Sequence, residues 1–305
     1  MILAVFGRTR ILLRTVEALA EAGHSIAFLG TAKPSDTDGT VEEDFERCAR
    51  EVGATYFRGK LTAALSGVGE PRPKLGVSMN WPSILGADEI GLFEDGILNA
   101  HAGDLPRYRG NACPNWAILN GEQRIGLCVH KMTPGLVDAG PILLRRYFEL
   151  DTTLDIGDVY RWLERSIPEM FVEAVGAIER GGAVLTEQPA DPSLSLRCFP
   201  RRPEDGAIDW TADSETVLRL VRASAKPFHG AFTTLEGNQT VRIWRADSFV
   251  AGFPFCAVPG QVLHSKSAGV VIACGSGSVR LMEATFSDGT DAIPVVGASL
   301  RNRLK

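Results

Sequence analysis

The sequence predicts an α/β fold with a parallel sheet at its core, followed by a smaller β-rich domain. Over residues 1–150, short apolar runs alternate with helical stretches, which is the pattern of a parallel sheet with helices on its faces. A proline- and serine-rich stretch follows the last long helix, and short alternating segments separated by turns fill the remainder. The 305 residues suffice for two domains of ordinary size. We predict domains at 1–190 and 204–305, joined by a linker at 191–203.

The elements of the first domain follow from the period of its apolar residues. Continuous or alternating apolar runs predict strands over 2–6, 24–29, 54–57, 75–79, 96–99, 124–131 and 142–150. Apolar residues at helical spacing predict helices over 11–22, 41–52, 113–120 and 155–180. Gly23 and Gly53 stand where the first two helices should end, as glycine after a helix favours.

The sequence predicts a second domain made mostly of β-strands. A helix is expected over 214–224, and short alternating segments predict strands over 230–235, 240–244, 270–273 and 279–283. Turn residues separate these segments, which is typical of a small β barrel or sandwich.

Composition excludes several classes of protein. The net charge of −5 and the pI of about 5.6 leave no broad basic surface for nucleic acid or an anionic membrane. No apolar run reaches the roughly 18 residues of a membrane span, and the first residues lack a signal-peptide layout, so we expect a cytoplasmic protein without a membrane partner. The six cysteines form no C-x-x-C pair and the five histidines show no zinc spacing, so we expect reduced thiols and no metal.

The turn after the first strand argues against nicotinamide binding. A dinucleotide site needs G-x-G-x-x-G there, but this turn has the single glycine Gly7. The sequence also contains no phosphate-binding G-x-x-x-x-G-K-[ST] loop and no G-x-S-x-G elbow. A dehydrogenase therefore remains only as a weak alternative.

Polar residues gather where the strand over 96–99 ends. Asn99 and His101 are two residues apart, so their side chains should emerge on the same side, at the carboxyl edge where open α/β sheets bind ligands. Asp138 precedes Ala139-Gly140 in a second polar loop. Taken by themselves, Asn99 and His101 are more typical of a loop stabilised by an Asx turn with an exposed histidine, and Asp138 is more typical of an ordinary turn.

Longer motifs carry a resemblance to a known family. They are Ile97 to His101, Leu105-Pro106-Arg107-Tyr108-Arg109-Gly110, Pro114-Asn115-Trp116-Ala117-Ile118, Asn120-Gly121-Glu122 and His130 to Leu143. Together they resemble the signature of N10-formyltetrahydrofolate-dependent formyltransferases, which include methionyl-tRNA and amino-sugar formyltransferases. Residues 201–210 and 226–232 are similar to the small β domain of that family. The resemblance implies a Rossmann-like formyltransferase domain, a C-terminal OB-like β-barrel and N10-formyltetrahydrofolate as co-substrate.

The resemblance also implies the catalytic residues. The family's Asn-His-Asp triad falls on Asn99, His101 and Asp138. The Asn99 amide and a protonated His101 would stabilise the oxyanion of a tetrahedral intermediate, and Asp138 or His101 would take the proton of the attacking amine. A neighbouring Asp138 carboxylate is expected to raise the pKa of His101 above its usual value of about 6.5.

The resemblance also implies where the two substrates bind. The pterin of the folate is expected at Ser83, Ile84 and Leu85 and at the segment from Leu136 to Gly140. The acceptor is expected to be a nucleotide-linked amino sugar, whose diphosphate would meet cationic side chains at Arg8, Arg10, Arg107 and Arg109.

Other acceptors and classes remain open. They are methionyl-tRNA, an amino acid or hydroxylamine, and a non-enzymatic folate- or nucleotide-binding module. Residues 201–305 contain 12 Lys and Arg against 10 Asp and Glu, which is little positive charge for gripping a tRNA backbone. A homodimer is also compatible with the sequence.

Three departures from the family's pattern qualify the assignment. Gly103-Asp104 stands where the family has Ser-Leu, which would add a carboxylate beside the site. Five residues, 133–137, separate Met132 from Asp138 where four are expected, so the loop contains a one-residue insertion. The loop from Gly7 to Ile11 lacks the small-residue motif of the methionyl-tRNA members.

Overall fold

The computed structural model describes residues 1–33, 39–65, 72–236, 239–252, 254–266 and 269–305. The chain divides into two compact units. The first contains residues 1–113, 124–149 and 160–198, and the second contains 114–123, 150–159 and 199–305. The predicted domain limits stay a prediction.

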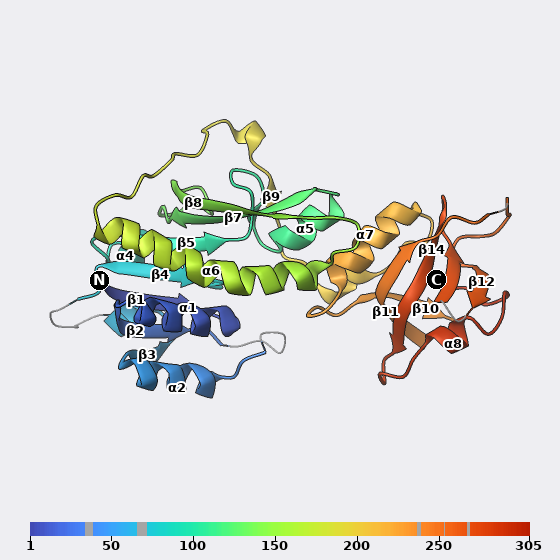
Figure 1. The fold of residues 1–305 in the computed structure, drawn as a ribbon, viewed down its shortest axis with the longest axis horizontal. Coiled ribbons are helices and arrows are strands. Elements are labelled where there is room, and N and C mark those ends of the chain that lie inside the picture. The colour runs from blue at the N-terminus through green and yellow to red at the C-terminus, as the bar shows by residue number, and fades with distance from the viewer. Residues whose placement is uncertain (34–38, 66–71, 237–238, 253, 267–268) are drawn as a thin grey trace. The chain divides into compact units, whose positions relative to one another are not determined.

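The first unit is built on a seven-stranded sheet with the order β3-β2-β1-β4-β5-β7-β8 (Figure 1). Its strands are β1 (Ile2–Gly7), β2 (Ser25–Thr31), β3 (Thr55–Arg58), β4 (Leu75–Met79), β5 (Ile97–His101), β7 (Arg124–Lys131) and β8 (Ile142–Glu149). The strands from β3 to β5 are parallel, whereas β7 and β8 run antiparallel to their neighbours. The predicted Rossmann-like core with a parallel sheet is confirmed for β3 to β5, and the two antiparallel strands β7 and β8 make the whole sheet mixed.

Helices cover both faces of this sheet because strand side chains alternate between the faces. The helices of the first 180 residues are α1 (Thr9–Glu21), α2 (Glu42–Val52), α3 (Leu61–Leu65), α4 (Ala87–Ile90), α5 (Cys113–Leu119) and α6 (Ile156–Glu179). Ala4 and Phe6 of β1 pack with Leu61 and Leu65 of α3 on one face. Leu3 and Val5, which alternate with Ala4 and Phe6 along β1, are also fully buried, so the opposite face of the sheet is covered as well.

The second unit contains a five-stranded antiparallel sheet with the order β10-β11-β14-β13-β12. Its elements are α7 (Ser214–Ser224), β10 (Ala231–Leu235), β11 (Gln239–Ser248), β12 (Val262–Lys266), β13 (Gly269–Ala273), β14 (Ser278–Phe286) and α8 (Ile293–Val296). Val217 and Val221 of α7 share a buried core with Val241 and Ile243 of β11.

The last residues of the chain close this sheet into a barrel-like shape. Lys305 exchanges two backbone hydrogen bonds with Thr234 of the edge strand β10, at 2.9 and 3.0 Å. Val262 of the other edge strand, β12, donates to Asn302 O at 3.2 Å. The predicted β-rich second domain is therefore confirmed, with a curled antiparallel sheet that is closed only in part.

The predicted linker at 191–203 and the residues just before it are more structured than the prolines suggest. Thr186 and Ile142 exchange two backbone hydrogen bonds of 2.8 Å. Farther on, β9 (Arg197–Cys198) pairs in parallel with β6 (Arg109–Gly110), and 3-10 turns lie at Pro192–Leu194 and Pro203–Gly206. Proline interrupts regular elements, but the remaining backbone groups still find partners.

Candidate active site

The candidate site is built on the carboxyl end of β5. Asn99 and His101 lie two residues apart on this strand and are almost fully buried. In the sheet, Asn99 is paired with Ser78 of β4 on one side and with His130 of β7 on the other. Cross-strand partners share a face, so Asn99, His101 and His130 project from the same face of the sheet, as predicted for the first two.

The His101 ring is held by the backbone of the loop that follows β5. Its Nε2 lies 2.6 Å from Tyr108 O, and because a carbonyl oxygen only accepts, Nε2 carries the proton. The ring fits there because residue 103 is glycine. A Cβ atom on Gly103 would lie 2.5 Å from His101 Nε2 and 2.2 Å from Tyr108 O. Gly103, a departure from the family's pattern, is thus required by the position of the ring.

Asp138 reaches His101 from the loop between β7 and β8. Its Oδ2 lies 3.4 Å from His101 Nδ1 and accepts a hydrogen bond from Gly110 N at 2.9 Å. Leu136 N donates to Thr133 O, and Gly135 has a φ of +72° in this turn. The turn absorbs the extra residue of the loop, so the insertion leaves the carboxylate beside His101.

The two titratable groups of this pair have pKa values below their ordinary ones. The pKa of Asp138 falls to about 2: its burial opposes the shift, but the attraction of the imidazolium forms of His101 and His130, together with the Gly110 N–H, outweighs burial. The pKa of His101 is lowered because burial disfavours its charged form more than Asp138 favours it. The prediction that Asp138 raises the pKa of His101 above its usual value is therefore wrong.

His130 is a site residue that the sequence reasoning missed. Its Nε2 lies 3.3 Å from Asn99 Nδ2 and 3.5 Å from Asp138 Oδ1, and its Nδ1 lies 3.3 Å from Lys131 O. A proton on Nδ1 lets Nε2 accept from the Asn99 amide, which fixes the orientation of that amide. The signal was a histidine inside the family motif, but its contact with Asn99 depends on the antiparallel register of β5 and β7.

The residues predicted at the pterin differ in their surroundings. Ile84 and Leu136 are large apolar side chains with exposed fractions of 68% and 57%, whereas Ser83 is exposed and polar. Leu85 is 4% exposed and belongs to the buried core of β1 and α3, so its side chain is packing. A Cβ on Gly140 would lie 1.8 Å from Lys131 O, so the loop is drawn close against β7 there.

The four predicted acceptor arginines do not form one cluster of equivalent cations. Arg8 directly precedes α1, and Arg10 is exposed in the first turn of that helix. Arg107 is exposed and lies over the Tyr108 ring at 5.3 Å. Arg109 is half-buried and donates from Nη2 to Gln188 at 2.7 Å.

The carboxylate of Asp104 does not join the site. It pairs with Arg145 of β8 and accepts from the Tyr147 hydroxyl at 3.1 Å. The sequence expectation that Asp104 adds a carboxylate beside the triad is wrong, because these β8 partners hold it elsewhere.

The described residues show neither a metal site nor a membrane-spanning helix. Within those ranges, no group of three His, Cys, Asp or Glu side chains has the arrangement of a metal site. None of the helices so described is both long and apolar enough to cross a membrane.

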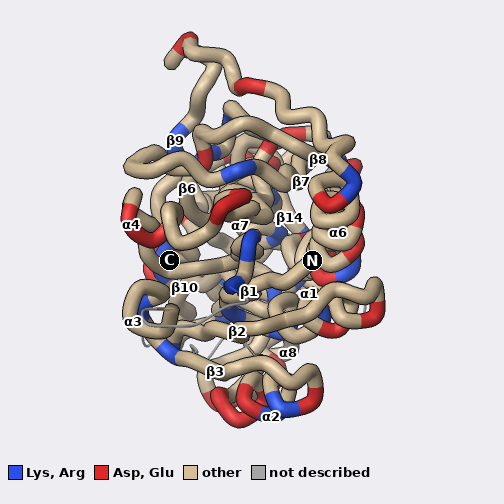
Figure 2. Tube along the Cα trace, turned by 90° about the vertical axis from the view of Figure 1, so that its left-hand side faces the viewer, with Lys and Arg blue, Asp and Glu red and all other residues tan. Residues whose placement is uncertain are grey.

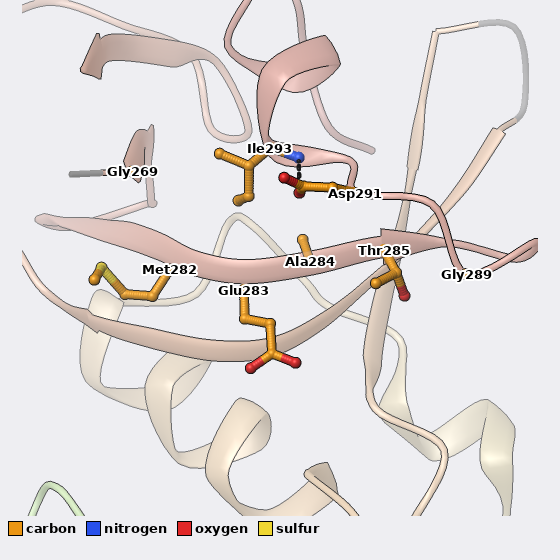
Figure 3. Close-up of a pocket in the computed structure, with 8 residues that line it drawn as sticks. All are labelled: Gly269, Met282, Glu283, Ala284, Thr285, Gly289, Asp291 and Ile293. Atoms are coloured by element: carbon orange, nitrogen blue, oxygen red, sulfur yellow. Dashed lines mark hydrogen bonds between the residues drawn. The ribbon is translucent and has the colours of Figure 1, made fainter. Parts of the chain in front are cut away.

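A hollow of about 400 Å³ lies on the second unit (Figure 3). Figure 3 shows Asp291 and Ile293 on one side of β14 and Glu283 pointing to the other. The Asp291 carboxylate already accepts from Ile293 N at 2.9 Å. None of the eight lining residues is a histidine, cysteine or arginine, and the two carboxylates of the lining are already engaged, Asp291 with Ile293 N and Glu283 with Lys226. The lining residues are Gly269, Met282, Glu283, Ala284, Thr285, Gly289, Asp291 and Ile293.

Comparison with solved structures finds the same fold in a known enzyme. A crystal structure of WlaRD, described as a sugar 3N-formyl transferase in the presence of dTDP and 5-N-formyl-THF, superposes with a TM-score of 0.69. The match covers 92% of this chain and 97% of that chain, at 15% sequence identity. This likeness supports the architecture of both units.

Comparison of sequences identifies the family. The family model for formyl transferase matches residues 1–175, and the model for the formyl transferase C-terminal domain matches residues 201–292. A methionyl-tRNA formyltransferase of Anaeromyxobacter dehalogenans is 30% identical over 301 residues, which cover 96% of this chain and 94% of the relative. One of Geobacter metallireducens is 32% identical over 214 residues, covering 70% of this chain and 66% of the relative. The chain, which brings an asparagine, a histidine and an aspartate together at the end of β5, therefore belongs to the formyl transferase family and is a formyltransferase.

Proposed function

We propose that this enzyme transfers the formyl group of N10-formyltetrahydrofolate to the primary amine of a nucleotide-linked amino sugar. The convergence of Asn99, His101 and Asp138 carries the proposal, because these three types supply an oxyanion donor, a proton acceptor and a group that stabilises the protonated acceptor.

His101 is the proton acceptor in this mechanism. Because burial keeps its pKa low and its Nε2 proton is held by Tyr108 O, the neutral ring has a free lone pair on Nδ1. The Nδ1–Oδ2 distance of 3.4 Å exceeds that of a charge-assisted hydrogen bond, which agrees with an unprotonated Nδ1. Asp138, with a pKa of about 2, is too weak a base to take the proton itself near neutral pH.

The attack of the amine on the formyl carbon forms a tetrahedral intermediate with an oxyanion. Asn99 donates one amide N–H to His130, which leaves its second N–H for that oxyanion. The proton of the attacking nitrogen passes to His101 Nδ1, where Asp138 stabilises the resulting imidazolium. Collapse of the intermediate breaks the bond to N10 of the folate, and His101 passes its extra proton to N10, so that tetrahydrofolate leaves and the ring is neutral again.

The residues present fit the folate co-substrate. Exposed apolar side chains at Ile84 and Leu136 suit the faces of a pterin ring. The buried Nε1 of Trp81 has no hydrogen-bond partner within the described part of the chain, so a polar ligand atom would satisfy it. Trp81 also packs edge-to-face on Phe6 at 5.2 Å, which fixes its ring.

The charge distribution supports a small acceptor over a tRNA. In the second unit, Arg280 pairs with Asp247 at 2.7 Å, Lys226 pairs with Glu283 at 3.5 Å, and Arg219 pairs with Glu215. In Figure 2, acidic and basic positions are interleaved along α2 and α6. Cations that are already neutralised contribute little to binding a phosphate backbone.

Methionyl-tRNA is the second candidate acceptor, favoured by the names of the two sequence relatives. The cytoplasmic location and the homodimer stay predictions.

The test is a panel of amines supplied with N10-formyltetrahydrofolate, scored by release of tetrahydrofolate and by mass of the formylated product. The panel contains nucleoside-diphosphate amino sugars, charged initiator tRNA, free amino acids and hydroxylamines. We expect release only with an amino sugar, and we expect it to be lost in Asn99→Ala while circular dichroism shows a folded protein. Release with methionyl-tRNA alone would refute the sugar assignment, and release with none of the amines would refute the proposed reaction.

A further inference from the structure

The segment that returns from α6 toward β6 lies against the candidate site. We call residues 183–198 the return segment. It is fixed near its start by the two backbone hydrogen bonds between Thr186 and Ile142, and at its end by the pairing of Cys198 with Gly110. Between these points its half-buried residue Gln188 contacts the loop that carries Asp138.

Both the nitrogen and the oxygen of the Gln188 side-chain amide form hydrogen bonds in this contact. Its Nε2 donates to Asp138 O at 2.9 Å and to Gly140 O at 2.7 Å, and its Oε1 accepts from Arg109 Nη2 at 2.7 Å. Carbonyl oxygens only accept and a guanidinium only donates, so this orientation of the amide is the one that satisfies all three partners. A side-chain amide matches two acceptors and one donor, and Gln188 supplies it here.

The contact joins the segments that position the carboxylate. Arg109, held by Gln188, is followed by Gly110, whose N–H donates to Asp138 Oδ2 at 2.9 Å. Asp138 itself has a φ of +50°, a left-handed conformation that a non-glycine residue adopts only when its surroundings hold it. Gln188 holds the main chain of Asp138, while Gly110 holds its side chain.

We propose that Gln188 is a positioning residue for the formyl transfer proposed above: it keeps the Asp138 loop in the conformation that places the carboxylate against His101. The expected fall in kcat rests on the proposed function, whereas the expected displacement of the Asp138 carboxylate does not. Without the two amide donors, the carbonyls of Asp138 and Gly140 turn toward water and the carboxylate moves away from the ring.

The proposal predicts a change in the titration of His101. The charged or titratable groups that act on this ring are Asp138, which favours its protonation, and His130 and Arg197, which oppose it. Moving Asp138 away removes the favourable contribution, so the pKa of His101 falls further. The acidic limb of the kcat–pH profile then moves to lower pH.

The test compares Gln188→Met with wild type. Methionine matches the length of glutamine but cannot form the three hydrogen bonds. We expect kcat to fall at least ~10-fold, as displaced catalytic groups do, with the acceptor KM changed less than about threefold. The His101 signal in nitrogen-edited NMR should titrate at lower pH than in wild type. The matched control is Gln123→Met, at an exposed glutamine of the second unit, which should leave both readouts unchanged.

Each outcome either supports or refutes the positioning role of Gln188. An unchanged kcat, or a reduced kcat with unchanged His101 titration and unchanged pH profile in a folded protein, overturns the positioning role. If Gln188→Met does not fold, Gln188→Glu carries the test, because it keeps the acceptor for Arg109 while losing both donors; its kcat should fall by a similar factor, and a wild-type kcat refutes the proposal. If wild type releases no tetrahydrofolate with any amine, the proposed function fails, and the NMR titration alone still tests the positioning of Asp138.

Discussion

The contact of His101 with Gly103 allows the position of the catalytic ring to be tested through a single methyl group. In Gly103→Ala, the new Cβ would lie 2.2 Å from Tyr108 O and 2.5 Å from His101 Nε2, whereas ordinary contact begins at 3.4 Å. The backbone carbonyl must therefore move by about 1.2 Å, or the ring must leave its hydrogen bond. Relieving such overpacking costs about 1–3 kcal/mol of folding free energy.

The substitution should also slow the reaction. A displacement of about 1 Å in a catalytic group costs ~10²-fold in rate, so kcat for tetrahydrofolate release should fall by about that factor. The loss of stability should lower Tm by roughly 2–10 °C, leaving the protein folded at the assay temperature. Gly252→Ala is the control, since a Cβ there meets nothing within 4 Å. A Gly103→Ala enzyme with wild-type kcat would show that the site does not need His101 in this position.

Three further predictions follow from the same geometry. His101→Ala should lower kcat by at least ~10² while binding of the folate, measured by calorimetry, survives; near-normal turnover would remove His101 from the mechanism. Asp138→Asn should lower kcat comparably, because a neutral amide cannot stabilise the His101 imidazolium, and full activity would assign that role elsewhere. Because burial lowers the pKa of His101, the unfolded histidine binds a proton below about pH 6.5 while the folded one stays neutral, so stability should fall as the pH drops below that value. Urea unfolding between about pH 7 and 5.5 should show a shallower decline in His101→Gln, and an equal decline would contradict the lowered pKa.

Local patterns in the sequence were enough to predict the longer elements and the parallel sheet at the core of the first unit, but not the order of its strands. The spans expected for β4, β7 and α7 agree with the structure at both ends, and α6 differs by one residue at each end. These segments are long or strongly periodic, so their burial pattern is visible without the fold. The elements α3, α4, β6, β9, β12 and α8 were missed; most are too short for a period to be recognised, and their formation depends on partners elsewhere in the chain.

For the site, the sequence by itself determined which residue types are available and where along the chain they stand. The spacing of Asn99 and His101 was enough to place both side chains on one face of a strand, because a strand repeats every two residues. The family motif added Asp138 despite the inserted residue. No pattern of this kind could show that Asp104 is held by Arg145, since that contact joins residues 41 positions apart.

Only the tertiary structure decided how these groups act on one another. Burial set the direction of the His101 pKa, against the expectation from its carboxylate neighbour, because the cost of removing a charge from water depends on every atom that surrounds it. The antiparallel register of β5 and β7 brought His130 to Asn99, and the return segment brought Gln188 to Asp138. Such contacts arise where distant segments of the chain meet, so their chemistry exists only once the chain has folded.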